Sequence, residues 1–380
     1  MIPYGRQDVT SDDIKSVVKV LESDFLTQGP VVPKFEKKIS EITQADHAVA
    51  VNSCTSGLHI ACLALGLGPG DFLWTSSITF VASANCALYC GAKVDFVDVD
   101  PDTGLISTDN LREKLIEAKK LGCLPKIVIP VHFAGQPCDM LQIYELSQEF
   151  GFKIIEDAAH AVGATYHEKP VGCCEYSDIT VFSFHPVKII TSGEGGACVT
   201  NDTNIANLMR RLRSHGITRK KEELQNSNME SWYYEQIDLG LNYRMTDIQA
   251  ALGMSQLNRL ANYIKEREKI AKWYDQKLQN IDVSPLLKKA SRKSSNHLYV
   301  IRAFDQIDSR DKLFSYLKSE NIGVNVHYIP VYRHPYFNSD IRLEGAENYY
   351  KSAITLPIFP TISKKELIRV VKQISNFIKK

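Results

Sequence analysis

Between His47 and Leu212 the sequence alternates short β-branched runs with amphipathic stretches long enough to form helices. This alternation is typical of parallel βαβ units, whose strands form one sheet with helices on its faces. We therefore predict a doubly wound α/β domain, in which ligands bind at the carboxyl ends of the strands. The predicted strands are Ala48–Val51, Phe72–Ser76, Lys93–Val97, Lys126–Val131, Lys153–Glu156, Ile179–Phe184 and Ala197–Thr200, and the predicted helices are Gly57–Leu65, Val81–Tyr89, Thr108–Leu121 and Met140–Phe150.

A different pattern begins near residue 250. Because a single hydrophobic core stops growing beyond about 250–300 residues, a chain of 380 residues is expected to divide. We predict a large domain over residues 1–250 and a smaller α+β domain over residues 251–380. The evidence is a long charged helix over Thr246–Tyr274, a strand over Leu298–Phe304, a helix over Ser309–Glu320 and a strand near Val324–Tyr328.

The charge balance favours a small ligand over a macromolecular one. The 45 Lys and Arg residues nearly equal the 44 Asp and Glu residues, so no broad field attracts nucleic acid or a membrane surface. No apolar run reaches the roughly 18 residues that a membrane-spanning helix needs, and the charged first thirty residues do not resemble a signal peptide. Nine scattered cysteines, an odd number, are typical of reduced thiols. We expect a cytoplasmic protein.

Two acidic or thiol-rich motifs do not predict a metal site. Cys173 and Cys174 are adjacent, which is the wrong spacing for a pair of zinc ligands. Asp98, Asp100 and Asp102 alternate as in a calcium loop, but Thr103 stands where that loop needs glycine. We expect a solvated loop there.

A glycine run also lacks the context of a nucleotide site. Gly66, Gly68 and Gly70 end a predicted helix and precede a predicted strand. The dinucleotide fingerprint has the opposite order, strand before helix, so a turn is predicted.

Lys188 is the candidate nucleophile. It follows an apolar strand in Ser183-Phe184-His185-Pro186-Val187-Lys188, and Gly193, Gly195 and Gly196 come after it. Most lysines are simply solvated, but this one is flanked by apolar residues. An apolar environment disfavours the ammonium form, lowers the pKa, and leaves an amine able to attack an aldehyde.

Asp157 ends the predicted strand that precedes it and is followed by His160. Helix capping is one explanation for an acidic residue at this place. A carboxylate here also suits pyridoxal phosphate, whose ring nitrogen must stay protonated to act as an electron sink. Glu156 points to the other face of the strand by the period of two, and is therefore the weaker candidate.

The polar run Asn52–Gly57 separates a predicted strand from a helix. Free N–H groups at a helix start bind phosphate, and Thr55 and Ser56 add hydroxyl donors, although helix capping alone also explains the run. Ser183 offers a further donor. Phe80 follows another strand, where its ring either stacks on a flat cofactor or packs in the core.

Lys188, Asp157, Thr55 and Ser183 in these settings resemble the DegT/DnrJ/StrS sugar aminotransferases, which have the fold-type I structure of pyridoxal-phosphate enzymes, with a large doubly wound mixed sheet and a smaller C-terminal α+β domain. The resemblance covers nearly the whole chain. It runs through Thr27–Pro30, Asn52–Gly57, Glu156–Ala161, Ser183–Gly196 and Gly240–Met245, and Ile2–Gln7, Ser294–Tyr299 and Val326–Tyr328 are most similar to the branch that serves pseudaminic acid biosynthesis.

The resemblance implies specific roles for the site residues. Pyridoxal phosphate would be attached covalently to Lys188, with Asp157 at its ring nitrogen and His160 beside the ring. Phe80 would stack on the cofactor, and Thr55, Ser56 and Ser183 would bind its phosphate. Asn242 would reach the phosphate of a second subunit's cofactor, in a homodimer with shared active sites. The sugar-nucleotide site would be lined by Tyr4, Phe25, Leu26, Thr27, Gln28, Val326, His327 and Tyr328.

The resemblance also implies a ping-pong reaction. L-glutamate would give its amino group to the cofactor, and C4 of a UDP-linked 4-keto sugar would receive it. Two other interpretations stay open: the same chemistry on another nucleotide-linked keto sugar, and a non-catalytic cofactor-binding or regulatory protein on this fold. A nicotinamide-dependent oxidoreductase would require the glycine fingerprint that the sequence does not supply.

Overall fold

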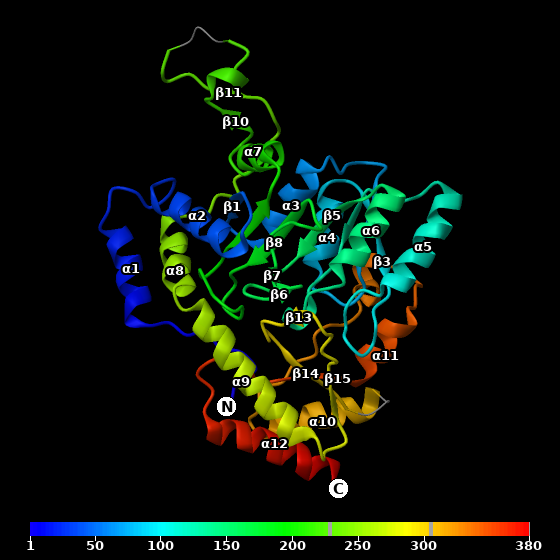
Figure 1. Ribbon diagram of the computed structural model, residues 1–380. Coiled ribbons are helices and arrows are strands. Elements are labelled where there is room, and N and C mark those ends of the chain that lie inside the picture. Colours follow the sequence, from blue (N-terminus) through cyan, green and yellow to red (C-terminus); the bar gives the residue numbers. More distant parts are fainter. Residues whose placement is uncertain (227–229, 304–306, 380) are drawn as a thin grey trace.

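A computed structural model of the chain describes residues 1–226, 230–303 and 307–379 and contains one large sheet (Figure 1). The strand order is β1-β9-β8-β5-β4-β2-β3. All seven strands predicted from the sequence are confirmed, with bounds that differ by a residue or two. They are β1 (His47–Val51), β2 (Phe72–Ser76), β3 (Lys93–Val97), β4 (Ile127–Ile129), β5 (Lys153–Asp157), β8 (Ile179–Ser183) and β9 (Gly196–Thr200).

One strand breaks the parallel arrangement. β9 pairs antiparallel with both β1 and β8, so the expectation of parallel βαβ units throughout is wrong at this strand. Parallel neighbours need a crossover, usually a helix, and the connection from β8 to β9 contains none. The chain therefore turns back on itself, and the turn carries Lys188. The mixed sheet implied by the family resemblance is confirmed.

Both faces of the large sheet are covered by helices. Side chains alternate along β1, so that Val49 and Val51 pack in one core and Ala48 and Ala50 in another. The first core lies against α3 (Cys54–Ala64), α4 (Ala82–Tyr89) and α7 (Thr203–Leu212); the opposite face lies against α2 (Val31–Thr43), α5 (Thr108–Leu121), α6 (Met140–Phe150) and α8 (Asp247–Leu257). The four predicted helices of this region are confirmed.

A second core lies beyond α8, around a three-stranded sheet (Figure 1). Its hydrophobic cluster includes Ile2, so the start of the chain packs among C-terminal elements. The division into residues 1–250 and 251–380 stays a prediction. The elements of this region are α9 (Leu260–Leu278), β12 (Ser284–Pro285), β14 (Tyr299–Arg302), α10 (Ile307–Ser319), α11 (Glu344–Ser352), β15 (Ala353–Leu356) and α12 (Lys364–Ile378).

Two C-terminal predictions are wrong. The single helix predicted over Thr246–Tyr274 is two helices, α8 and α9, separated at Arg259. No glycine or proline marks the break; it occurs where the Arg259 guanidinium reaches Asp13 Oδ2 at 2.6 Å, on α1 (Ser11–Leu21).

The strand predicted near Val324–Tyr328 is only an isolated bridge from Asn325 to Thr355, because Val326 and its two successors turn toward a cavity. The predicted strand over Leu298–Phe304 is confirmed as β14, although Phe304 lies outside the described residues.

Two of the three rejected motifs, the glycine run and the acidic loop, have structural roles. Gly66 and Gly70 have φ values of 73° and 92° in the connection from α3 to β2, which confirms the predicted turn. The expectation of a solvated acidic loop is wrong for Asp98. This side chain is buried and accepts hydrogen bonds from the N–H groups of Gly345 and Ala346, both 2.8 Å long, at the start of α11. Helix starts need such acceptors.

A short two-stranded arm projects past α7 at one end of the molecule (Figure 1). Its strands are β10 (Ile217–Thr218) and β11 (Glu235–Gln236). A further small sheet consists of β13 (Arg292–Lys293), β6 (Thr165–Tyr166) and β7 (Lys169–Pro170). None of the helices in the described part of the chain is both long enough and apolar enough to cross a membrane.

Arg267 on α9 connects separate segments of the C-terminal region. Its guanidinium is 1% exposed and donates from Nη1 to the carbonyls of Asn296, His297 and Ile358 at 3.1–3.3 Å. It pairs with no carboxylate in the described ranges, and burial lowers its pKa to about 10. Three backbone acceptors therefore depend on one side chain.

We predict that Arg267→Met lowers the free energy of unfolding by about 2–4 kcal/mol, because it leaves those carbonyls without their donor. Urea unfolding followed by circular dichroism measures the change. Lys269→Met is the matched control, since this side chain of the same helix is 59% exposed and should change stability by no more than about 0.5 kcal/mol. Equal midpoints for the two variants would contradict the role given to Arg267.

Candidate active site

A cavity of about 520 Å³ opens at the carboxyl edge of the large sheet, where ligands of such folds bind. Its volume suits a small cofactor with part of a substrate. Most of the residues predicted from the sequence border it. These are Tyr4, Thr55, Phe80, Asp157, His160, Ser183, Lys188, Val326, His327 and Tyr328.

Lys188 lies in the connection between β8 and β9, where its N–H donates to the His185 carbonyl at 2.9 Å. The side chain borders the cavity and is half-buried. Burial lowers the pKa of its amine, while the negative charge of Asp157 acts in the opposite direction. The amine is therefore more often neutral, and more nucleophilic, than that of a free lysine.

Asp157 is buried at the end of β5, and hydrogen-bond donors hold both of its carboxylate oxygens. The Ser83 hydroxyl donates to Oδ2 at 2.6 Å and the Ala159 N–H to Oδ1 at 3.0 Å. Glu156 lies on the other face of the strand, 2.6 Å from His132 Nε2. The expectation that Glu156 points to the other face of the strand is confirmed, and Asp157 borders the cavity whereas Glu156 does not.

The start of α3 forms another wall. Ser53 caps the helix by accepting the Ser56 N–H at 3.1 Å, and the first N–H groups of a helix have no acceptor within it. Thr55 borders the cavity beside them. Gly196 of β9 permits this arrangement, since a Cβ there would lie 2.8 Å from the Cys54 nitrogen. The helix start thus offers N–H and hydroxyl donors to an anion.

Phe80 does not pack in the core. Its side chain is 59% exposed and borders the cavity, and its ring centroid lies 6.2 Å from that of Tyr328. The ring is therefore available to cover a flat ligand.

Three histidines and Tyr328 form the remaining wall. His160 Nε2 lies 3.2 Å from the Tyr328 hydroxyl, and its ring centroid lies 4.4 Å from that of His297. Burial lowers the pKa of His160 and of His297, and burial together with the charge of Lys188 lowers that of His327 to about 3. These side chains are neutral near pH 7. The buried Nδ1 of His160 has no partner within the described ranges, which leaves it for a ligand.

Several predicted residues lie away from this cavity. Ser56 does not border it, because its hydroxyl donates to Asn52 Oδ1 at 2.6 Å. Phe25, Leu26, Thr27 and Gln28 are exposed near the start of α8, where Leu26 accepts the Asp247 N–H at 3.0 Å. Asn242 is exposed after the arm. The roles expected for these residues stay predictions.

Five of the residues that were not predicted as site residues have polar or ionisable side chains at or behind the cavity wall, and each has a usable signal in the sequence. Cys54, His297, Asn325 and Glu194 border the cavity, and all lie within or next to segments that carry the family resemblance. Ser83 contacts Asp157 instead. It lies three residues after Phe80, on the same face of a helical turn.

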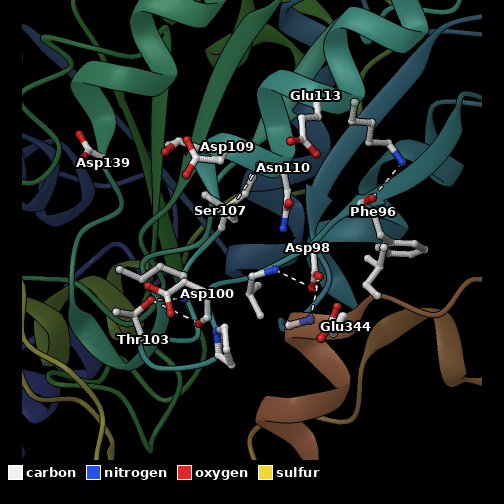
Figure 2. Close-up of a pocket in the computed structure, with 18 of the residues that line it drawn as sticks. Phe96, Asp98, Asp100, Thr103, Ser107, Asp109, Asn110, Glu113, Asp139 and Glu344 are labelled. Atoms are coloured by element: carbon white, nitrogen blue, oxygen red, sulfur yellow. Dashed lines mark hydrogen bonds between the residues drawn. The ribbon is translucent and has the colours of Figure 1, made fainter.

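A larger concavity, of about 1050 Å³, is not the cofactor site. Figure 2 shows that Asp98, Asp100, Asp109, Glu113 and others line it, and this negative charge repels phosphate. Some of these acids already have structural partners. Asp98 caps α11, and Asp139 Oδ2 accepts a hydrogen bond from Arg292 Nη2 at 2.7 Å.

The smaller cavity fits pyridoxal phosphate chemically. An aldehyde needs an amine, which Lys188 supplies; a pyridine nitrogen needs a carboxylate, which Asp157 supplies. A phosphate needs donors, which the start of α3 supplies, and the unpartnered His160 Nδ1 leaves a polar contact for the ring substituents.

Comparison with known proteins decides the family. The sequence pattern of the DegT/DnrJ/EryC1/StrS aminotransferase family matches residues 7–375. The chain belongs to this family.

Individual family members are similar over their full length. The spore coat polysaccharide biosynthesis protein SpsC of Bacillus subtilis is 38% identical over 388 residues, which cover 100% of this chain and 97% of SpsC. A UDP-4-amino-4,6-dideoxy-N-acetyl-beta-L-altrosamine transaminase of Campylobacter jejuni strain 81-176 is 37% identical over 373 residues, or 96% of this chain and 94% of that protein.

Solved structures of the family have the same fold. Helicobacter pylori PseC, an aminotransferase of pseudaminic acid biosynthesis, superposes with a TM-score of 0.90 at 31% identity, over 100% of this chain and 99% of PseC. A Streptococcus pneumoniae protein, solved in its pyridoxamine phosphate form, gives a TM-score of 0.90 at 28% identity over 100% and 99% of the two chains. This DegT/DnrJ/EryC1/StrS member is therefore a sugar aminotransferase that depends on pyridoxal phosphate.

The lowered pKa of Lys188 predicts how the rate of its reaction with an aldehyde depends on pH. Only the neutral amine reacts, so in protein freed of cofactor the rate of reductive methylation by formaldehyde should rise with pH and level off below the ordinary lysine pKa of about 10.4. Mass spectrometry separates modification at Lys188 from that at Lys365, an exposed internal reference.

Asp157→Asn provides the matched control. Because the Asp157 charge raises the pKa of Lys188, its removal should shift the midpoint to lower pH. A midpoint at or above the ordinary lysine value, or an upward shift in the variant, would show that burial does not control this amine.

Proposed function

We propose that the enzyme transfers the amino group of L-glutamate to C4 of UDP-2-acetamido-2,6-dideoxy-β-L-arabino-hexos-4-ulose. The product is UDP-4-amino-4,6-dideoxy-N-acetyl-β-L-altrosamine, a step of pseudaminic acid biosynthesis. The observation that supports this choice is the 37% identity, over 96% of the chain, to the Campylobacter jejuni transaminase of that name. The likeness to the PseC fold is in agreement.

The side chains divide the work between cofactor and substrate. Pyridoxal phosphate, when bound, supplies the electron sink for the transfer. Lys188 would hold the cofactor, and its free amine would move a proton at the substrate carbon. Asp157 would keep the ring nitrogen protonated, and the start of α3 with Thr55 and Ser183 would bind the phosphate. Phe80 would cover one ring face and exclude water.

The far side of the cavity would orient the sugar. Tyr4 and His327 lie with ring centroids 5.5 Å apart, and His327 Nδ1 lies 2.8 Å from Thr355 Oγ1. His327 Nε2 lies 3.2 Å from Asn325 Nδ2, so both ring nitrogens are held and the neutral ring gives this wall a fixed shape. The Tyr328 hydroxyl is hydrogen-bonded to His160 Nε2. Tyr328 would therefore connect the wall that faces the sugar to the wall that faces the cofactor.

A second candidate is the same transfer to another nucleotide-linked 4-keto or 3-keto sugar. The similarity to SpsC, at 38% identity over the whole chain, favours it. The residues that act on the cofactor would be unchanged, and only the wall that faces the sugar would select a different epimer.

A panel of sugars tests the proposed function. The enzyme should aminate the β-L-arabino sugar faster than its C5 epimer or a nucleotide-linked 3-keto sugar, as followed by loss of glutamate and by mass spectrometry of the product. Lys188→Ala should reduce turnover by about 10⁴-fold or more, whereas Lys365→Ala, at an exposed helix position, should not. A preference for another sugar supports the second candidate, and full turnover by Lys188→Ala refutes both.

The proposal includes a homodimer in which Asn242 of one subunit reaches the cofactor phosphate of the other. Asn242 is exposed and does not border the cavity of its own chain. In the segment that precedes it in the sequence, Trp232 is 68% exposed and Leu239 86% exposed. Such apolar side chains on an arm suit a surface that a second subunit covers.

Complementation between inactive subunits tests the shared site. Lys188→Ala and Asn242→Ala chains, carrying different tags, should each form weakly active homodimers. A purified hybrid should regain activity, because one of its two sites combines an intact Lys188 with the other subunit's intact Asn242. A hybrid no more active than its parents would place both residues in the same subunit's site. A tagged dimer of two Lys188→Ala chains controls for the tags.

A further inference from the structure

A buried hydroxyl pair lies behind the Asp157 carboxylate. Ser83 Oγ is 2.6 Å from Asp157 Oδ2, and Thr79 Oγ1 is 2.8 Å from Ser83 Oγ. Ser83 and Thr79 are 0% and 2% exposed, and Asp157 is 5% exposed. Water therefore has little access to these contacts, and in such surroundings each hydrogen bond is strong.

The direction of this chain of hydrogen bonds follows from the number of protons. A serine hydroxyl has one proton, and an ionised carboxylate only accepts. The Ser83 proton must therefore go to Asp157, and Ser83 Oγ must accept from Thr79. The Phe80 carbonyl, at 3.4 Å from Ser83 Oγ, is the weaker alternative acceptor.

The same turn of the chain holds Phe80 over the cavity. The Ser83 N–H donates to the Phe80 carbonyl at 3.2 Å, and α4 begins at Ala82. The positive end of a helix dipole thus lies near the carboxylate as well. The turn at the start of α4 therefore contacts Asp157 through Ser83 and also positions the Phe80 ring beside the cavity.

We propose that Ser83, supported by Thr79, is a positioning residue that orients Asp157 and stabilises its negative charge so that the cofactor ring nitrogen stays protonated. This inference rests on the proposed role of Asp157 as the partner of that nitrogen. Ser83 does not border the cavity. Thr79 does border it, but its hydroxyl is directed to Ser83 Oγ at 2.8 Å. They act on the reaction through Asp157.

The test uses the holoenzyme loaded with pyridoxal phosphate that is ¹⁵N-labelled at the ring. In the wild-type protein the nitrogen resonance should be that of a protonated ring. Ser83→Ala should move it toward the neutral-ring position and slow the single-turnover reaction with L-glutamate by about 10- to 100-fold, which is the effect of one lost hydrogen bond to a charged group. The concentration of glutamate at half-saturation should change little. Thr79→Val should give the same changes to a smaller degree.

Two controls keep the outcomes distinct. Ser76→Ala removes a hydroxyl that is equally buried and has no partner within the described residues, so the resonance should not move. Asp157→Asn should give the largest shift. If Asp157→Asn shifts the resonance and neither Ser83→Ala nor Thr79→Val does, the positioning role is refuted. If Asp157→Asn has no effect, the role of Asp157 itself fails.

Discussion

The active site depends on the burial of one amine at the edge of a sheet. Lys188 can condense with an aldehyde because its half-buried amine borders the cavity, and burial lowers its pKa against the opposing charge of Asp157. The same burial keeps the neighbouring histidines neutral. The neutral histidines leave few charged groups on the cavity wall. The charges that remain interact strongly, because electrostatic interactions are weakly screened where water is excluded.

The sequence predicts the large sheet and the cofactor half of the site well. Both follow from local signals: β-branched runs define the strands, and Asp157, Lys188 and Thr55 each come directly after one of these strands or at the start of the next helix. The antiparallel return of β9 was not predictable from strand patterns, because β-branched composition does not encode direction. The break between α8 and α9 coincides with the contact of Arg259 with Asp13, which joins residues far apart in the sequence.

The two walls of the cavity come from different parts of the chain. Asp157, Lys188 and the start of α3 lie at the edge of the large sheet, whereas Val326 to Tyr328 belong to the segment before α11. The second wall can therefore change shape without altering the strand ends that hold the first.

The pairing of Ile2 with Ile322 has a consequence for synthesis. The first residues of this sequence are held by a segment that is synthesised much later, through the bridge to Ile322 and the Gly323 N–H that donates to the Ile2 carbonyl at 2.6 Å. Tyr4, two residues further on, borders the cavity. A nascent chain on the ribosome can fold its large sheet early, but the wall of the cavity at Tyr4 cannot be fixed until the segment around Ile322 has left the ribosome.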